Sequence, residues 1–165
     1  MLSTSPGRDH SPPTVVIVGN GNWQVASDKA GPMVIKSLAG RYGASVQIKD
    51  IGTSALGLLE CLDSQDLMLV VDACVKGGAP GEIHVIQPDL DAPLREKPGL
   101  HQIGPVETLM VAKYLYPHTL PKTISLILIE TQGLNDADLE PVCQRGVSII
   151  DRKIAEVFRA DAFTG

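Results

Sequence analysis

The fold is decided by the stretch Val15-Val-Ile-Val-Gly-Asn-Gly-Asn-Trp-Gln-Val-Ala-Ser-Asp-Lys-Ala-Gly31. Its β-branched opening run predicts a strand buried on both faces. Gly19 and Gly21 then predict a sharp turn. We expect Ser27 or Asp28 to follow as the side-chain cap of a helix. This order places Asp28 at the carboxyl end of a central strand, where open α/β sheets bind their ligands.

The glycine turn does not match the motifs of nucleotide-binding proteins. It lacks the third glycine of G-x-G-x-x-G, and the chain contains no G-x-x-x-x-G-K-S/T. An acidic residue at the mouth of the site, Asp28, would also repel a phosphate. A nucleotide-binding α/β domain is therefore kept only as an alternative.

The composition is that of an acidic chain of 165 residues, with a formal net charge of −5 and a pI near 5.3. That balance gives no reason to expect a nucleic acid or an anionic membrane as a partner. Hydrophobic residues make up 44% and aromatic residues 4%, which favours an aliphatic core and a parallel sheet covered by helices. We expect one domain over residues 14–160, after a disordered Ser/Pro-rich tail over residues 1–13.

The cysteines indicate a reducing compartment. Cys61, Cys74 and Cys143 are widely spaced and form no C-x-x-C pair, which argues against a disulfide framework or a cysteine zinc site. No apolar run is long enough for a membrane span, and the first residues lack the apolar core of a signal peptide. We therefore expect a cytoplasmic protein, with Cys74 as a small buried side chain rather than a site thiol.

Hydrophobic periodicity predicts alternating strands and helices along the chain. The expected strands are residues 15–18, 45–50, 67–72, 82–87 and 123–130, and the expected helices begin near residues 28, 55, 104 and 135. The fourth strand is expected at a sheet edge. The fold class is therefore α/β: a three-layer α/β/α sandwich with a mostly parallel sheet of about five strands.

Three polar side chains stand at strand ends or open a long loop: Asp28, Asp72 and His101. Two carboxylates and an imidazole suit a divalent metal such as Zn²⁺ or Ni²⁺, which could polarise a carbonyl or activate water. Each residue also has a structural alternative: a helix cap for Asp28, loop N–H groups for Asp72, and a loop contact for His101. For His84 we expect a solvated strand position, and for Trp23 a packing role.

The chain resembles the hydrogenase maturation endopeptidases, which trim the C-terminus of the [NiFe]-hydrogenase large subunit. The similarity covers about residues 15–158 and depends on the order and spacing of short motifs. These motifs are Gly19, Gly21 and Asn22 with Asp28 and Gly31, Asp50-Ile-Gly-Thr53, Val70-Val-Asp-Ala73, Gly78-Ala-Pro-Gly81, His101-Gln-Ile-Gly104 and Leu128-Ile-Glu130.

The resemblance implies a function. It implies a phosphorylase/hydrolase-like, peptidase-like domain that removes a C-terminal peptide from a nickel-loaded large-subunit precursor. Asp28, Asp72 and His101 match the family's metal-contacting and catalytic positions, and they would sense the nickel of the precursor, for which zinc or another divalent ion can substitute. Asp50, Gly52 and Thr53 match the segment linked to substrate recognition. Metal-bound water and a carboxylate general base are both open as the hydrolytic group.

The sequence also departs from the family pattern. Ser27 replaces a second acid, Ile51 replaces a glycine, and Lys29 introduces a charge that would weaken cation binding if it pointed toward Asp28. These departures leave a second interpretation open: a non-catalytic accessory protein that binds the hydrogenase precursor or its metal.

Overall fold

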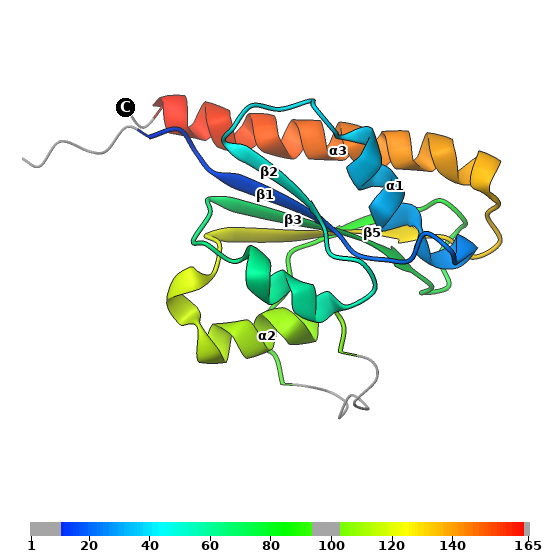
Figure 1. The fold of residues 1–165 in the computed structure, drawn as a ribbon, viewed down its shortest axis with the longest axis horizontal. Coiled ribbons are helices and arrows are strands. Elements are labelled where there is room, and N and C mark those ends of the chain that lie inside the picture. Colours follow the sequence, from blue (N-terminus) through cyan, green and yellow to red (C-terminus); the bar gives the residue numbers. More distant parts are fainter. Residues whose placement is uncertain (1–10, 94–102, 164–165) are drawn as a thin grey trace, which may run out of the picture.

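A five-stranded sheet forms the centre of the computed structural model, which describes residues 11–93 and 103–163 (Figure 1). The strands follow the order β2-β1-β3-β5-β4. Their bounds are Val15–Gly19 for β1, Val46–Asp50 for β2, Leu67–Cys74 for β3, Ile83–Ile86 for β4 and Thr123–Glu130 for β5. The α-helices are α1, Ala30–Ser37, α2, Pro105–Leu115, and α3, Asp136–Phe163; short 3-10 helices are η1, Ala26–Asp28, η2, Ala55–Cys61, and η3, Pro117–Thr119.

Strand β1 is buried on both faces, as its sequence predicts. Val15 and Ile17 belong to one hydrophobic cluster and Val16 and Val18 to the other, and none of the four is more than 1% exposed. Because side chains alternate along a strand, an uninterrupted apolar run fills the core on both sides of a parallel sheet.

Helices cover both faces of the sheet. Helices α1 and α3 pack on one face, and α2 and η2 pack on the other (Figure 1). The predicted stripe of α3 is buried against the first face through Leu139, Val142, Ile150 and Ile154. The expected three-layer α/β/α sandwich is therefore confirmed.

Strand β4 is an edge strand, as the sequence predicts; it pairs with β5 alone, and the structure shows that this pairing is antiparallel. The other four strands run parallel, so their carboxyl ends lie along the same end of the sheet. We call this row of strand ends the carboxyl edge. Two elements are longer than expected: β3, expected to end at residue 72, continues to Cys74, and α3, expected to end near residue 158, continues to Phe163. The added residues of β3 place Cys74 at the carboxyl edge.

Several predictions concern the ends of the chain. Most of the expected disordered tail, residues 1–10, lies outside the described residues, and the proposed domain boundaries stay a prediction. Within the part that the structure describes, every helix is too short or too polar to cross a lipid bilayer.

Candidate functional site

Two glycines, Gly21 and Gly31, allow the start of α1 to lie directly against the end of β1. A Cβ on Gly31 would lie 2.2 Å from the carbonyl oxygen of Asn20 and 2.7 Å from that of Val71. Gly21 adopts φ +146°, and a Cβ there would lie 2.1 Å from the carbonyl oxygen of Asp28. The glycine spacing therefore has a steric reason: only glycine permits this approach of η1 and α1 to the carboxyl edge.

Asp72 is a buried carboxylate at this edge, 9% exposed. It accepts hydrogen bonds from Asn20 Nδ2 at 3.0 Å and from the Ala73 N–H at 2.9 Å. Burial raises the pKa of Asp72 to about 6; the two hydrogen bonds oppose that rise, and the charge of Asp28 adds to it. Asp72 therefore titrates close to neutral pH.

Asp28 lies near enough to Asp72 for their charges to interact. Its own pKa is raised by partial burial, against the opposing effect of the Asn22 backbone N–H. The expectation that Ser27 or Asp28 caps the helix is wrong, because both residues belong to a 3-10 turn, η1. Lys29 occupies the N-cap of α1, and no side chain caps this helix. With no capping role, the Asp28 carboxylate remains available to the site.

The charge of Lys29 is directed away from this pair. Its Nζ lies 2.6 Å from Oδ1 of Asp136 at the start of α3. The ion pair holds the ammonium on the α1–α3 side, so the departure at Lys29 does not neutralise Asp28.

The segment Asp50–Thr53 packs against the glycine turn. The Gly52 N–H donates to the Asp50 carboxylate at 2.9 Å, and the Gly52 carbonyl accepts from the Gly21 N–H at 2.8 Å. Ile51 N–H donates to the Gly19 carbonyl at 3.0 Å. The loop expected to recognise substrate therefore lies beside the turn that carries Asp28. The third predicted site residue, His101, lies outside the described residues.

Three residues near this edge were misread or missed from sequence. Asn20 was not singled out, although it donates to Asp72. His84 is not a solvated strand residue: its side chain is 28% exposed and points to Glu130. Cys74 packs against a hydrophobic cluster, as expected, but it is only half-buried and is also hydrogen-bonded to Glu130. Burial, followed by the charge of Glu130, raises the pKa of its thiol to about 11. The sequence does contain a signal for Cys74: side chains alternate along a strand, so Cys74 lies on the same face as Asp72, two residues before it.

Trp23 is not the packing anchor that its residue type suggested. It is 44% exposed, and Lys36 Nζ lies 5.6 Å from its ring centroid. Trp23 therefore forms part of the surface next to the glycine turn.

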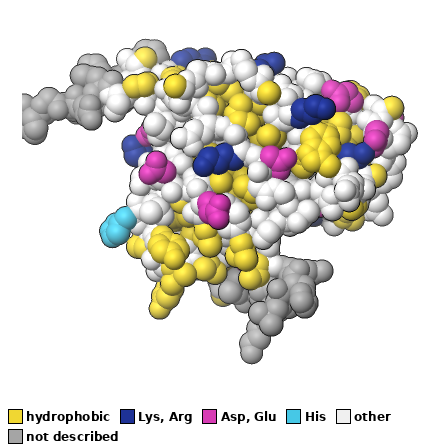
Figure 2. Space-filling view, viewed as in Figure 1, with side chains coloured by type: hydrophobic (Ala, Val, Ile, Leu, Met, Phe, Trp, Pro, Cys, Tyr) yellow, Lys and Arg dark blue, Asp and Glu magenta, His cyan; other side chains and the backbone are white. Residues whose placement is uncertain are grey.

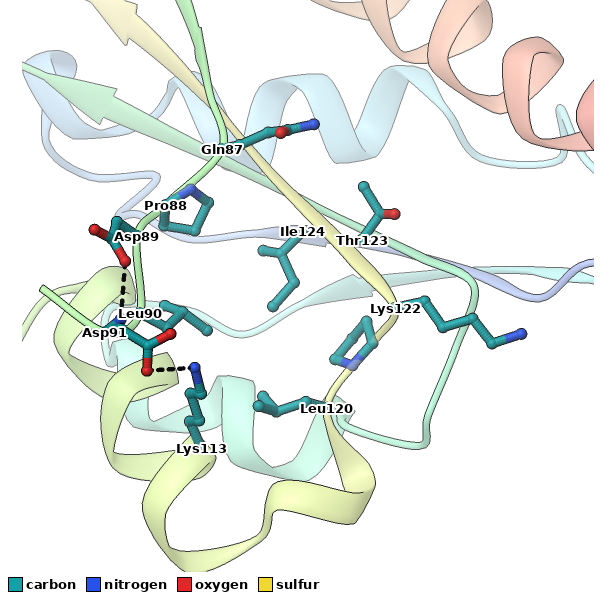
Figure 3. A pocket seen from close by; sticks show the side chains of 11 residues that line it. Gln87, Pro88, Asp89, Leu90, Asp91, Lys113, Leu120, Lys122, Thr123 and Ile124 are labelled. Carbon is teal, nitrogen blue, oxygen red and sulfur yellow. Dashed lines mark hydrogen bonds and ion pairs between the residues drawn. The ribbon is translucent and has the colours of Figure 1, made fainter.

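The described pockets lie away from Asp72. One pocket of about 390 Å³ lies between residues 87–91 and 120–124, at the opposite end of β5 from the carboxyl edge (Figure 3). Its Asp91 and Lys113 form an ion pair at 2.6 Å. A second pocket, of about 450 Å³, is lined by Lys49, Asp50, Ile51, Gly57, Glu60 and Cys61 and so adjoins the expected recognition loop.

The raised pKa of Asp72 predicts a pH-dependent stability. The pKa is about 6 in the fold against an ordinary 3.8, so the folded state binds more protons than the unfolded state between these values. The free energy of unfolding should therefore fall as pH rises from about 4 to 6. Asp72→Asn, measured by urea unfolding, should be more stable than the unmodified chain at pH 8 by on the order of 2–3 kcal/mol, with the difference vanishing near pH 4. An equal difference at both pH values would contradict this effect.

Comparison with known proteins agrees with this arrangement. The model of the hydrogenase maturation protease family matches residues 32–156. The chain belongs to the hydrogenase maturation protease family. Its curated relatives include the hydrogenase expression/formation protein HoxM of Azotobacter vinelandii, 28% identical over 75% of this chain and 61% of the relative. HupD of Rhizobium leguminosarum bv. viciae is 30% identical over 75% of this chain and 62% of the relative. The chain thus matches less than two thirds of the length of these relatives.

Solved structures of the hydrogenase maturation protease family share the fold. The [NiFe] hydrogenase maturation protease HycI from Thermococcus kodakarensis is 26% identical, with a TM-score of 0.65 over 90% of this chain and 94% of that one. The hydrogenase maturating endopeptidase HybD from E. coli has the same TM-score at 22% identity, over 85% and 93% of the two chains. The sequence-based assignment to this family is therefore confirmed, as is the fold.

Proposed function

We propose that this chain is an endopeptidase that removes a C-terminal peptide from the nickel-loaded large-subunit precursor of a [NiFe] hydrogenase in the cytoplasm. The observation that carries the proposal is the pair of electrostatically coupled carboxylates, Asp28 and Asp72, at the carboxyl edge of a fold of this protease family. Nickel is then part of the substrate, and zinc or another divalent ion can take its place in experiments.

The donor chemistry of the edge suits a divalent cation. Asp28 and Asp72 supply oxygen ligands, and burial raises the pKa of both carboxyl groups. Asn20 Oδ1 is buried and finds no hydrogen-bond partner among the described residues, so a further hard oxygen stands beside Asp72. A cation in the precursor would stabilise both carboxylates in their ionised form. His101 is proposed as the third contact.

Asp72 is suited to act on water. A general base must be ionised at the operating pH, and a pKa of about 6, which contact with the precursor's cation would lower further, meets that condition. In the proposed step the carboxylate takes a proton from a water molecule that attacks the scissile carbonyl carbon. The C–N bond then breaks, and the proton passes to the leaving amine.

Two surface features support the proposal that the substrate is a protein. The pocket beside Asp50 adjoins the segment proposed for recognition, namely Asp50, Gly52 and Thr53. Hydrophobic side chains also gather over α2 and the turn after it (Figure 2); Val111, Tyr114, Leu115 and Tyr116 are all exposed there. An exposed apolar group of this kind is typical of a protein-binding surface.

The proposal is tested by the intact mass of a large-subunit precursor from the same organism after incubation with this protein. We expect loss of a short C-terminal peptide from the nickel-loaded precursor and an unchanged mass for the nickel-free precursor. Cleavage of both forms would refute the nickel requirement.

The same experiment tests the accessory-protein alternative. A complex on a sizing column, with the precursor mass unchanged, would support binding without cleavage. Neither a complex nor cleavage for any large-subunit precursor of the organism would overturn the proposed function. The unrelated nucleotide-binding alternative does not agree with the family to which the chain belongs.

A further inference from the structure

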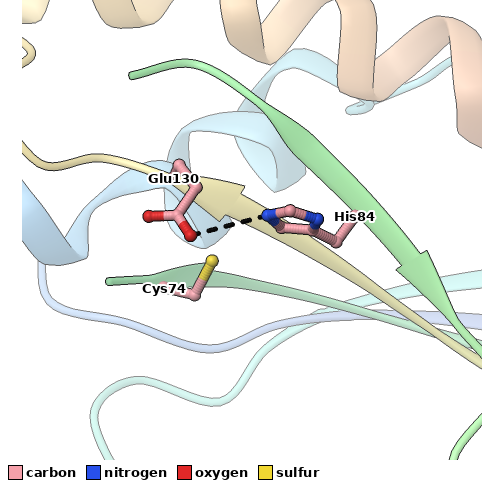
Figure 4. A group of neighbouring side chains, drawn as sticks. All are labelled: Cys74, His84 and Glu130. Carbon is pink, nitrogen blue, oxygen red and sulfur yellow. Dashed lines mark ion pairs between the residues drawn. The ribbon is translucent and has the colours of Figure 1, made fainter. Parts of the chain in front are cut away.

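A second group of metal-ligating side chains lies at the carboxyl edge, outside the Asp28–Asp72 pair. Cys74, His84 and Glu130 come from the neighbouring strands β3, β4 and β5 (Figure 4). One potential ligand atom from each, the thiol sulfur, an imidazole nitrogen and a carboxylate oxygen, lies within 4.8 Å of the other two. Among the described residues this is the one group of three or more such side chains with this geometry.

Strand register makes this convergence a property of the fold rather than of flexible side chains. Cys74 is directly opposite Glu130 in the β3–β5 ladder, and His84 is opposite Leu128 in the β4–β5 ladder. Paired residues of neighbouring strands point to the same face, and positions 128 and 130 share a face because side chains alternate. All three side chains therefore emerge on one face of the sheet.

The distance between the imidazole and the carboxylate agrees with tetrahedral coordination of a shared ion. His84 Nε2 lies 3.5 Å from Glu130 Oε1. Metal–ligand bonds of about 2.0 Å to nitrogen or oxygen and 2.3 Å to sulfur place neighbouring ligands of a tetrahedral zinc ion roughly 3.3–3.7 Å apart. His84 Nε2 is also buried and makes no hydrogen bond of good geometry in the described part of the chain; Glu130 Oε1, at 3.5 Å, is within ion-pair distance only.

We propose that Cys74, His84 and Glu130 form a divalent cation site, selective for Zn²⁺-like ions, that is separate from the site proposed to contact the nickel of the precursor. Thiolate, imidazole and carboxylate are the ligand types of zinc, and the thiolate disfavours Mg²⁺ and Ca²⁺. Binding releases the thiol proton to solvent as the metal–sulfur bond forms. The ion's two positive charges then balance the thiolate and the carboxylate, and solvent supplies the fourth ligand.

A bound ion would hold together the ends of β3, β4 and β5 next to Asp72. Glu130 already accepts the Lys76 N–H at 2.9 Å and 3.1 Å through its two oxygens, and the Gly78 N–H at 3.3 Å. Burial acts to raise the pKa of Glu130, but these N–H donors lower it overall and hold the group ionised. A bound ion would join this loop anchor to β3 and β4, and Asp72 lies two residues before Cys74 on the same face.

A nucleophilic cysteine is a poorer explanation of the same cluster. An active Cys–His pair needs the imidazole to take the thiol proton, with the carboxylate behind the imidazole. Here Cys74 and His84 both contact Glu130, and the pKa of the thiol is raised rather than lowered. A shared cation accounts for three ligands that converge on one point.

Co²⁺ titration of the metal-stripped full-length protein tests the proposal directly. A cysteine-ligated tetrahedral Co²⁺ gives a near-ultraviolet thiolate charge-transfer band and strong visible absorption. We expect both to saturate at one equivalent, to disappear on addition of Zn²⁺, and to withstand excess Mg²⁺. Cys74→Ser should abolish the charge-transfer band. His84→Gln should weaken Co²⁺ binding by at least about tenfold, because a loss of that size follows even from removing the outer-shell partner of a ligand.

Matched variants separate this site from general effects. Cys61→Ala removes another thiol, and His118→Gln removes an exposed imidazole on η3; both should keep the band. Asp72→Asn should also keep it, because Asp72 is not one of the three ligands. A band that survives Cys74→Ser, or affinity unchanged by His84→Gln, would overturn the proposal, as would the lack of any thiolate band. Because His84 lies on the edge strand β4, the His84→Gln variant still tests the proposal if Cys74→Ser does not fold. None of these readouts requires a precursor, so failure here is distinct from failure of the proposed function.

Discussion

Asp72→Asn is expected to slow cleavage of a nickel-loaded precursor by at least about 100-fold, the range typical for the loss of a general base. The amide carries no negative charge to contact the metal of the precursor, and it cannot accept a proton from water near neutral pH. Asp28→Asn should have a loss of similar size, because the two carboxylates act on the same cation. The measurement is the initial rate of precursor cleavage, followed by intact mass.

The loss should occur without unfolding, because the surroundings of Asp72 can adapt to an amide. Asn20 now donates through Nδ2 to Asp72, while its Oδ1 has no partner among the described residues. A half-turn of the Asn20 amide would present Oδ1 to the new NH₂ group of Asn at position 72. The Ala73 N–H can still donate to the remaining oxygen.

Asp91→Asn is the matched control for these variants. Asp91 is an exposed carboxylate paired with Lys113, in the pocket at the opposite end of β5. It should leave the cleavage rate unchanged. Full activity in both Asp28→Asn and Asp72→Asn would remove the two carboxylates from the proposed site, whereas an equal loss in Asp91→Asn would indicate a charge effect on precursor binding.

The elements that could be predicted from sequence are those whose hydrophobic pattern can be buried in only one arrangement. The apolar runs at Val15 and Leu67 must be covered on both sides, which requires a parallel sheet with helices on each face. Parallel strands end at a common edge, so Asp28 and Asp72 were expected together, and their charges do interact. The apolar stripe of α3 likewise has one favourable orientation, against the sheet.

The features that could not be predicted depend on what lies opposite a side chain. Alternation in β4 shows that His84 points away from Ile83, but not that Glu130 of the next strand lies on that side. The capping role expected of Asp28 fails because Asp28 ends η1 and Lys29 takes the N-cap position of α1, a choice between two helical geometries that local sequence does not decide. Trp23 has the residue type of an anchor, but the loop that carries it lies outside both hydrophobic clusters.

Gly31→Ala is expected to reduce the free energy of unfolding by more than about 4 kcal/mol, a size reserved for severe steric effects. The new Cβ would meet backbone oxygens rather than side chains: Asn20 O at 2.2 Å and Val71 O at 2.7 Å. Neither can rotate away, since the Asn20 N–H is bonded to the Val71 carbonyl at 2.9 Å at the junction of β1 and β3. Relief requires α1 to move off the sheet.

Gly146→Ala is the control for Gly31→Ala. It separates the effect of a steric clash at position 31 from the general effect of replacing a glycine by alanine. Gly146 lies inside α3, and a Cβ there would meet Val34 Cγ2 at 3.5 Å and Ile129 Cδ1 at 3.7 Å, which are ordinary contacts. Alanine stabilises a helix by about 0.5–1 kcal/mol relative to glycine, so the free energy of unfolding of this variant should be slightly higher than that of the unmodified chain. Urea unfolding of the pair should therefore give shifts of opposite sign. A small shift for Gly31→Ala would mean that α1 tolerates displacement, and that the position of Asp28 does not depend on the glycine contacts that set it beside Asp72.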